Sequence, residues 1–377
     1  MLELTADAKI LAAALKPAAD VAGDFRSMPV LSHVLLTAGG GKAEAAATDL
    51  ETEYRAEFPA DVAGEGSICV PAKTLLAAVS RLEGQVTLAE SEKLSLAVRA
   101  ERYEAEIFGL GPDDFPRSPR TGKGRPLRID SGRLSRAVDR VKWCTGQAGE
   151  RFNLKGVLLD LRGDGLYLAS SDSDCLSAIN AGQPIGAAPA DFRDESGRQA
   201  LVTAKGLAQV KALARGAGAV CLTLSGSFLV ADAGRETVKL KLLEGEFPDW
   251  PDLVPEGEPD SVAEIGREEL LKGLELMRPV LAPKWDVVFL EGGPESGTIA
   301  AELENPEAGM AKAEMAGSTT GQGFRVGFDS RRLAQIVRGM TERSEVRIEI
   351  RSDKAAVLRE KDGDGSVVLM GTVTKNE

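Results

Sequence analysis

Hydrophobic and polar residues follow two recurring patterns along this chain. At residues 131–143 apolar side chains return every three or four positions, which predicts a helix with one buried face. Apolar runs at 156–162 and 166–171 flank a Gly-Asp-Gly turn, which predicts a β-hairpin. A second helix at 203–215 precedes short strands within 219–243. Helices separated by hairpin-linked strands, without strict β-α-β alternation, indicate the α+β class.

The same unit recurs along the chain. An apolar residue, a helix-starting turn, a basic residue and a leucine follow one another at 70–75, 202–207 and 328–333. The first two of these segments are 132 residues apart, and the same distance separates the Phe-Pro segments at 114–116 and 246–248. Two independent markers with one spacing indicate repeated structural units.

Proline-rich segments at 112–126 and 249–259 are typical of linkers between such units. We therefore place three domains at 1–124, 125–254 and 255–377. Each is expected to pack two helices on antiparallel sheets. The six helices are expected at residues 6–16, 71–82, 131–143, 203–215, 267–278 and 329–343.

The distribution of charge matters more than its total. A net charge of −12 argues by itself against nucleic acid, because phosphates attract lysine and arginine. Yet the predicted helices together carry an excess of basic residues, so the remainder is strongly acidic. Arg133, Arg136 and Arg140 form one stripe on their helix. If the helices share one side, that side is positive and the acidic remainder repels DNA elsewhere. Ordinary solvated helix faces are the other interpretation.

The chain lacks recognisable catalytic motifs. No phosphate-binding loop, dinucleotide fingerprint or zinc motif is present, so we expect neither a cofactor nor a metal. The single histidine, His33, lies in the apolar run 30–36, which is read as a strand. The four cysteines are far apart and predict free thiols. The N-terminus has no signal-peptide layout and no stretch is long enough to span a membrane, so a cytoplasmic protein is expected.

Four short strings add a family resemblance. The segments at 28–36, 48–51, 70–73 and 245–250 resemble strings of the bacterial DNA polymerase III beta subunit, the DNA sliding clamp. The resemblance covers nearly the whole chain, and the strings occur in the family's order. It implies a head-to-tail homodimer whose six domains close a ring around double-stranded DNA. It also implies a processivity factor that binds DNA polymerase, a clamp loader and other clamp-binding proteins.

In such a ring the helices line the pore, where weak and sequence-independent phosphate contacts would let the clamp slide. The basic residues expected to face the DNA are Arg26, Lys73, Arg133, Arg136, Arg140, Lys142, Lys205, Lys211, Arg215, Arg331, Arg332 and Arg338.

The resemblance also implies a pocket for partner peptides between the second and third domains. The family usually has Thr/Ser-Asp-Gly-His-Arg-Leu there, whereas residues 171–176 of this chain read Ser-Asp-Ser-Asp-Cys-Leu. Asp252 occupies a basic position of the family, so the pocket is expected to be more acidic and to prefer a different peptide. The pocket residues are expected to be Leu154, Ser171, Asp172, Asp174, Cys175, Leu176, Pro248, Asp252, Leu253 and Met370.

The family's subunit contact joins domain one of one protomer to domain three of the other. The residues expected at this contact are Lys73, Arg102, Ile107, Glu302, Glu304 and Glu307. Glu104 stands where the family often has a basic residue, which weakens the expected charge pairing.

Two other functions fit the sequence. A clamp-fold protein could bind replication partners as a regulator or decoy without being loaded on DNA. An unrelated three-domain enzyme could carry a site that its sequence does not reveal.

Overall fold

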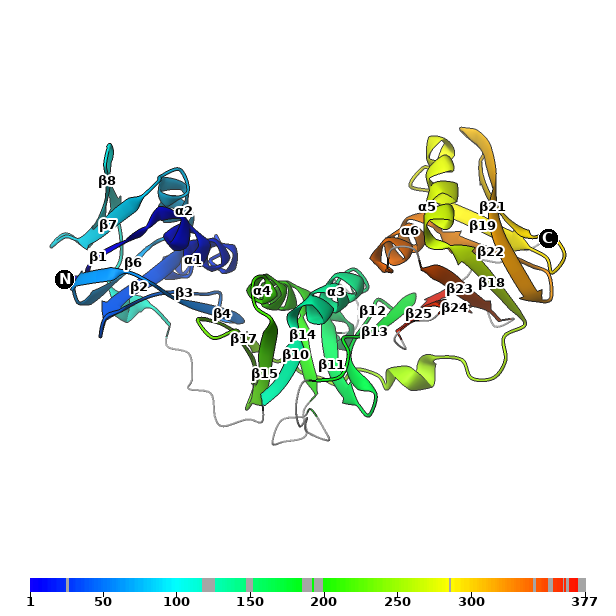
Figure 1. Ribbon diagram of the computed structural model, residues 1–377, viewed down its shortest axis with the longest axis horizontal. Helices are drawn as coiled ribbons and strands as arrows, with labels where there is room; N and C mark the ends of the chain where they lie inside the picture. The colour runs from blue at the N-terminus through cyan, green and yellow to red at the C-terminus, as the bar shows by residue number, and fades with distance from the viewer. Residues whose placement is uncertain are drawn as a thin grey trace. The chain divides into compact units, whose positions relative to one another are not determined.

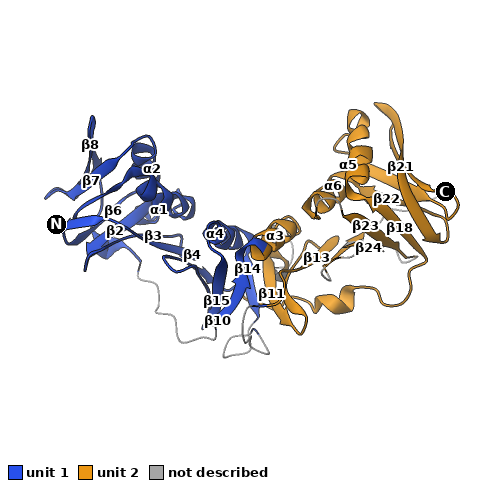
Figure 2. Ribbon diagram, viewed as in Figure 1, with its two compact units in different colours: residues 1–132, 184–242 blue, residues 133–183, 243–377 orange. Residues whose placement is uncertain are grey.

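A computed structural model of the chain is drawn in Figure 1. The residues that it describes are 1–24, 27–116, 126–146, 152–184, 192, 199–284, 286–341, 344–351, 355–361, 363 and 366–371. They form two compact units, coloured in Figure 2. Unit 1 comprises Met1–Gly132 with Pro184–Leu242, and unit 2 comprises Arg133–Gln183 with Leu243–Glu377.

The order of elements repeats along the chain, as the sequence predicts. Each copy begins with a strand and a helix, continues through strands to a second helix, and ends with three strands. This confirms the α+β class and the repeated clamp-type unit. The helices are α1 (Ala8–Val21), α2 (Ala72–Val79), α3 (Ser131–Val141), α4 (Ala204–Ala214), α5 (Arg267–Leu276) and α6 (Ser330–Gly339). Among the described residues, no helix is both long and apolar enough to cross a membrane.

Unit 1 holds two antiparallel sheets. The first has the order β5 (Asp61–Gly64), β1 (Glu3–Asp7), β7 (Gln85–Glu90), β8 (Ser95–Ala100) and β9 (Tyr103–Phe108). The second has the order β10 (Pro126–Asp130), β15 (Ala219–Ser225), β16 (Phe228–Asp232), β17 (Glu236–Lys241), β4 (Thr52–Phe58), β3 (Lys42–Thr48), β2 (His33–Gly39) and β6 (Gly66–Pro71). The pairing of β4 with β17 therefore joins the first copy to the second in one sheet.

Unit 2 is built on a long run of paired strands. Their order is β11 (Gly156–Arg162), β12 (Gly165–Ser171), β13 (Cys175–Asn180), β25 (Val367–Gly371), β24 (Ala355–Glu360), β23 (Glu345–Ile350), β18 (Ser261–Gly266), β21 (Gly309–Gly321), β20 (Thr298–Asn305), β19 (Val287–Gly292) and β22 (Phe324–Asp329). Here β13 of the second copy pairs with β25 of the third. The remaining strand, β14 (Ala200–Thr203), leads into α4 in unit 1.

The compact units divide the second copy. Its β10, α4 and final strands belong to unit 1, and its β11, β12 and β13 belong to unit 2. The domain boundaries at 124/125 and 254/255 therefore stay a prediction.

Polar caps and apolar faces explain the helices. Asp7 accepts the amide hydrogens of Lys9 and Ile10, at 3.0 and 3.4 Å, and thereby starts α1. Thr203 and Asp329 start α4 and α6 in the same way. On its buried face α1 packs against α2, β3 and β4, while α5 packs against α6 and β21. The helices thus cover one face of their sheets with apolar residues and leave their polar faces exposed.

One predicted element is different. The run 30–36 was expected to be a single strand, but Pro29–Ser32 form a short 3₁₀-helix and the strand β2 starts at His33. Pro29 at the first position fixes a helical φ and donates no hydrogen bond, which suits a helix start. The Nδ1 atom of His33 lies 2.8 Å from the carbonyl oxygen of Pro29, so the imidazole is held at this junction.

Candidate functional site

Basic side chains on the polar faces of the helices form the first part of the site. Lys73 on α2, Arg136 on α3, Arg215 at the end of α4, and Arg331 and Arg338 on α6 are all exposed. Within the part of the chain that the structure describes, no ion pair neutralises these five side chains. Their charges are therefore accessible to an anion in solution.

Several other predicted DNA-facing residues already have partners. Lys142 pairs with Asp139 at 2.9 Å, and Lys205 pairs with Asp49 at 2.6 Å. Because the two lysine side chains are still 48% and 60% exposed, these surface pairs leave their charge partly available. Arg133 is exposed and Lys211 is half-buried, and both make an interaction within the protein. Arg26 lies outside the described residues.

Arg140 has a different environment from its neighbours on α3. Its guanidinium lies 3.1 Å from a carboxylate oxygen of Glu360 on β24, and each side chain is only 12% exposed. An ion pair this enclosed is strongly coupled, because removing one partner would leave a charge with little water around it. Arg140 therefore links α3 to β24 within unit 2. Its contact with DNA stays a prediction.

Arg332 also points to a partner within unit 2. Its guanidinium lies 2.9 Å from Asp172 and 3.8 Å from Asp174, both in the turn between β12 and β13. A third nitrogen lies 3.5 Å from Asp329, the residue that caps α6. This residue was expected to face DNA, but its charge is shared among three carboxylates. The structure thus brings a predicted DNA-facing residue against predicted pocket residues.

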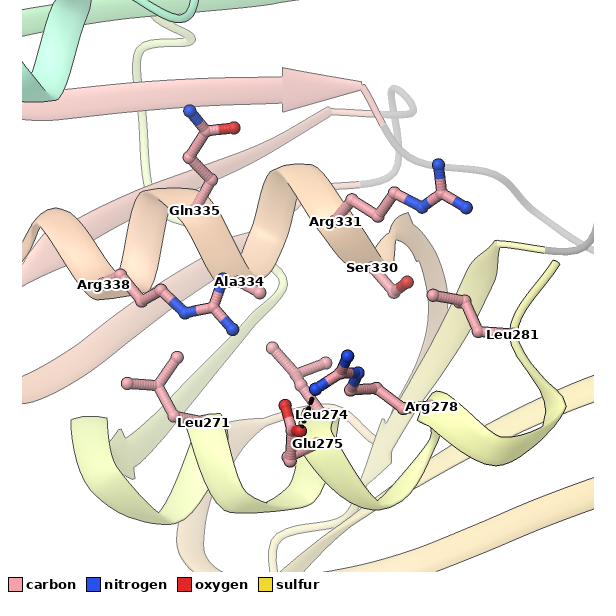
Figure 3. A pocket seen from close by; sticks show the side chains of 10 residues that line it. All are labelled: Leu271, Leu274, Glu275, Arg278, Leu281, Ser330, Arg331, Ala334, Gln335 and Arg338. Atoms are coloured by element: carbon pink, nitrogen blue, oxygen red, sulfur yellow. Dashed lines mark hydrogen bonds and ion pairs between the residues drawn. The ribbon is translucent and has the colours of Figure 1, made fainter. Parts of the chain in front are cut away.

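A groove of about 610 Å³ runs between α5 and α6 (Figure 3). Leu271 and Leu274 form part of its wall on α5, and Arg331 and Arg338 extend from α6 on the other side. Arg278, in the 3₁₀ turn after α5 (Arg278–Val280), also lines it and pairs with Glu275 at 2.5 Å. Arg278 ends the helix predicted at 267–278, and it was not among the residues expected to face DNA.

The turn between β12 and β13 shapes the candidate peptide pocket. Asp172 accepts the amide hydrogens of Asp174 and Cys175, at 3.2 and 2.8 Å, and the Ser171 hydroxyl donates to the Cys175 carbonyl at 2.8 Å. Ser173, at the tip, has a φ of +77°. The family's usual glycine at this position would adopt that φ without strain, whereas serine does not.

The predicted pocket residues fall into two groups, one buried near β13 and β25 and the other at a 3₁₀ helix that follows β17 in the sequence. Cys175 pairs in register with Met370 across β13 and β25, and Leu176, Met370 and Leu154 are all buried. On the other side, Pro248 is half-buried, and Asp252 and Leu253 are exposed in or beside a 3₁₀ helix (Trp250–Leu253). That helix is held to β11 and β12, because the Trp250 indole donates to Asp160 at 3.0 Å and packs on Tyr167.

The predicted subunit-contact residues other than Lys73 lie on or beside β9, the edge strand of its sheet, and β20, which lies between β21 and β19. Arg102 is exposed in the turn before β9, and Ile107 on β9 is 7% exposed and packs inward. Glu302 on β20 already pairs with Arg325 at 3.3 Å, and Glu304 also makes an interaction within the protein. Glu307 is exposed in the turn after β20. Their role in an interface stays a prediction.

Phe108 was missed by the sequence reasoning. It follows Ile107 on β9 and is 75% exposed, the most exposed large apolar side chain among the described residues. β9 lies at the edge of its sheet, with β8 as its paired neighbour. The alternation of inward and outward side chains along a strand could have identified it, because a buried Ile107 places residue 108 on the outward face.

Comparisons with known proteins agree with this architecture. Family models of the DNA polymerase III beta subunit match residues 2–119 as its N-terminal domain and residues 128–249 as its central domain. The beta sliding clamp of Pseudomonas aeruginosa is 27% identical over 365 residues, covering 95% of this chain and 96% of the relative. That of Caulobacter vibrioides is 26% identical and covers 89% and 90%.

Solved structures give the same result. The polymerase III beta subunit of Pseudomonas aeruginosa matches with a TM-score of 0.87 and 25% identity, covering 99% of this chain and 100% of that one. The polymerase sliding clamp of Bacillus subtilis matches with a TM-score of 0.90 over all of both chains, and its 16% identity shows a shared fold.

Repeated α+β units that carry basic helices on antiparallel sheets define a protein of the sliding-clamp class. This chain belongs to the DNA polymerase III beta subunit family, of which it is a divergent member. The prediction of a DNA sliding clamp is thereby confirmed, and with it the role of a replication processivity factor in place of an enzyme. The regulatory or decoy alternative is not favoured.

Proposed function

We propose that two copies of this chain close head to tail around duplex DNA in the cytoplasm and hold a replicative polymerase on its template. A clamp loader would open and close the ring, and other clamp-binding proteins would compete for the same pocket. The DNA itself would be held by encirclement, so that its contacts with the protein can stay weak and sequence-independent.

The observation that carries this proposal is the distribution of charge. The net charge is −12, yet Arg136, Arg215, Arg331 and Arg338 are exposed on helices, and no ion pair among the described residues neutralises them. Flexible, exposed arginines without an aromatic partner suit phosphate contacts better than base recognition. An acidic remainder would disfavour DNA on the other surfaces.

Retention on plasmid DNA tests encirclement directly. The chain is first loaded on nicked circular plasmid by a clamp loader and ATP. The sample is then divided into two halves, and the plasmid in one half is linearised. We expect retention at rising salt on circles and loss from linear DNA, because a ring slides off a free end. Equal, salt-sensitive binding to both forms would reduce the interaction to surface electrostatics and contradict the proposal.

The partner pocket is proposed to differ in its peptide preference. Asp174 stands where the family string has histidine, and Asp252 stands at another position where the family has a basic residue, so both add negative charge to the site. We expect a fluorescent clamp-binding peptide from a relative's polymerase to bind this chain at least about tenfold more weakly than it binds the relative's own clamp, a difference of about 1.4 kcal/mol. Equal affinity for the two clamps, measured by fluorescence anisotropy, would show that the altered residues do not change specificity.

A further inference from the structure

Two buried cysteines meet beside the candidate peptide pocket. Cys144 follows α3 and has no exposed surface, and Cys175 opens β13 with 4% of its surface exposed. The Cys144 Sγ donates to the carbonyl oxygen of Cys175 at 3.2 Å, and the two thiols are also hydrogen-bonded to each other. The two cysteines are 31 positions apart in the sequence, and the segment between them includes β11 and β12.

A cation lies on one side of this pair. The Nη1 atom of Arg332 is 3.4 Å from the Cys175 Sγ, while the same guanidinium is held by Asp172 at 2.9 Å. A fixed guanidinium stabilises a neighbouring thiolate, which is the nucleophilic form of cysteine. Asp172 opposes this effect, but its charge is already shared with Arg332 and with the turn's amide hydrogens.

The two thiols are consequently inequivalent. The hydrogen bond from Cys144, and then Arg332, lower the pKa of Cys175 below its ordinary value in spite of burial and of Asp172. The hydrogen bond with Cys175 and burial raise the pKa of Cys144. Cys175 is thus the more nucleophilic thiol, and Cys144 stays protonated beside it.

We propose that Cys144 and Cys175 form a dithiol that small peroxides oxidise to a disulfide, with Cys175 reacting first. The Cys175 thiolate attacks one oxygen of hydrogen peroxide, the O–O bond breaks, and protonation of the leaving hydroxide gives water and a sulfenic acid on Cys175. The Cys144 sulfur then attacks the Cys175 sulfur and loses its proton. The sulfenic oxygen leaves as a second water, so two thiols have lost two electrons to one peroxide.

The site would select small oxidants because both sulfurs are covered. Access would come through the turn of residues 171–175, whose Asp174 side chain is 80% exposed. The disulfide would tie the end of α3 to the start of β13, where Cys175 faces Met370. This chemistry depends only on the local geometry of unit 2, and it would occur whether or not the chain encircles DNA.

Peptide mapping tests the disulfide. The full-length chain is reduced, freed of reductant, exposed to hydrogen peroxide, then denatured and alkylated before digestion. We expect the Cys144 and Cys175 peptides joined, two hydrogens lighter than the sum of the two, and separated again by dithiothreitol. Cys69, whose pKa burial raises to about 12, should remain a free thiol. A linkage that uses Cys69 or Cys221, or no linkage at all, overturns the proposal.

Variants assign the order of the two steps. In Cys144→Ala the reaction should stop at a Cys175 sulfenic acid that dimedone traps, and in Cys175→Ala the Cys144 thiol should stay reduced. Arg332→Gln should slow labelling of Cys175 several-fold, whereas Arg331→Gln, its exposed neighbour, should leave the rate unchanged. Thermal melting verifies that each variant is folded. If a cysteine variant fails to fold, the two arginine variants still decide, because equal rates would remove the activating role of Arg332.

Discussion

Ser173 shows how one residue can keep a turn under strain. Its φ of +77° lies in the left-handed region, where a side chain costs about 1 kcal/mol or more relative to glycine. The surrounding hydrogen bonds hold the turn in place, including the one at 3.3 Å from the Ser173 amide to the Ser171 hydroxyl. The sequence shows that the family's glycine is missing here. It does not show that the backbone keeps the glycine conformation.

Replacing this serine by glycine should therefore stabilise the protein. We expect Ser173→Gly to raise the free energy of unfolding by about 0.5–1 kcal/mol. This net value combines the relief of backbone strain with the smaller loss that comes from the greater flexibility of glycine in the unfolded chain. Urea denaturation followed by circular dichroism measures the change. Ser173→Ala is the matched control and should bring no gain, because alanine meets the same backbone penalty. Equal stability of the glycine variant and the original chain would mean that the turn is not strained.

The helices were predictable from sequence because their apolar residues recur with helical spacing, and polar side chains cap α1, α4 and α6. The ends were less predictable. The structure carries α1 through Pro17 to Val21, beyond the expected residue 16, because its buried face continues with Ala18, Ala19 and Val21. Contacts across strands had no such signal. Arg332 meets Asp172 and Cys175 only because β13 and α6 are assembled in one unit, and no local pattern joins residues so far apart.

Strands of unit 2 share a charged network that should make stability depend on pH. Glu264 on β18 lies 2.9 Å from Lys361, just beyond β24, and 3.2 Å from Arg347 on β23. The hydrogen bond from Lys361 and the charges of both bases lower the pKa of Glu264. A lowered carboxyl pKa stabilises the fold above the unfolded-state value, about 4.3, and this contribution disappears as pH falls through the folded-state value.

Removing this carboxylate should destabilise the protein only when it would be ionised. We expect Glu264→Gln to cost about 0.5–1 kcal/mol at pH 7, as for partly exposed ion pairs, and the difference from the original chain to shrink as the solution is made acidic. Chemical denaturation at several pH values provides the measurement. Glu295→Gln, in the exposed turn between β19 and β20, should change little at any pH. A constant difference for Glu264→Gln would contradict an electrostatic origin.

At the scale of the whole molecule, the sequence repeats and the four short strings indicated the family and its function, whereas the role of each surface residue stays a prediction. Of the basic residues expected to face DNA, Arg140 and Arg332 hold elements of unit 2 together, while Arg136 and Arg338 are exposed. Spacing along a helix indicates a shared stripe. It cannot indicate which members of that stripe find a carboxylate on a distant strand, such as Glu360.

Charge reversal should show whether the exposed arginines of the helices contact DNA. We expect Arg136→Glu with Arg338→Glu to leave thermal stability nearly unchanged and to weaken salt-dependent DNA retention, because two exposed phosphate contacts become repulsive. Arg128→Glu with Lys241→Glu changes the net charge equally on exposed strand positions and is the control. If both double variants lose DNA to the same degree, total charge and not the helix surface governs binding.

Assembly of the ring should depend on the edge strand β9. We expect Phe108→Asp to shift the protein from dimer to monomer at low micromolar concentration, because a charge would replace a 75% exposed aromatic ring at the proposed contact. Analytical ultracentrifugation measures the shift. Leu50→Asp makes a similar change on an exposed turn and should leave the dimer intact. A Phe108→Asp protein that stays dimeric would place the contact elsewhere.

The pairing of β4 with β17 has a consequence for synthesis on the ribosome. β4 ends at residue 58, but the strand that covers its edge begins at residue 236, so the growing chain must carry an open strand edge until the second copy has emerged. Open edges invite pairing with other chains. Tyr54 is buried in the finished sheet opposite Val238, and it would be uncovered during this interval. Ribosomes that stall between the two copies should therefore release chains prone to aggregation, and a fragment that ends near residue 116 should precipitate where the complete chain stays dissolved.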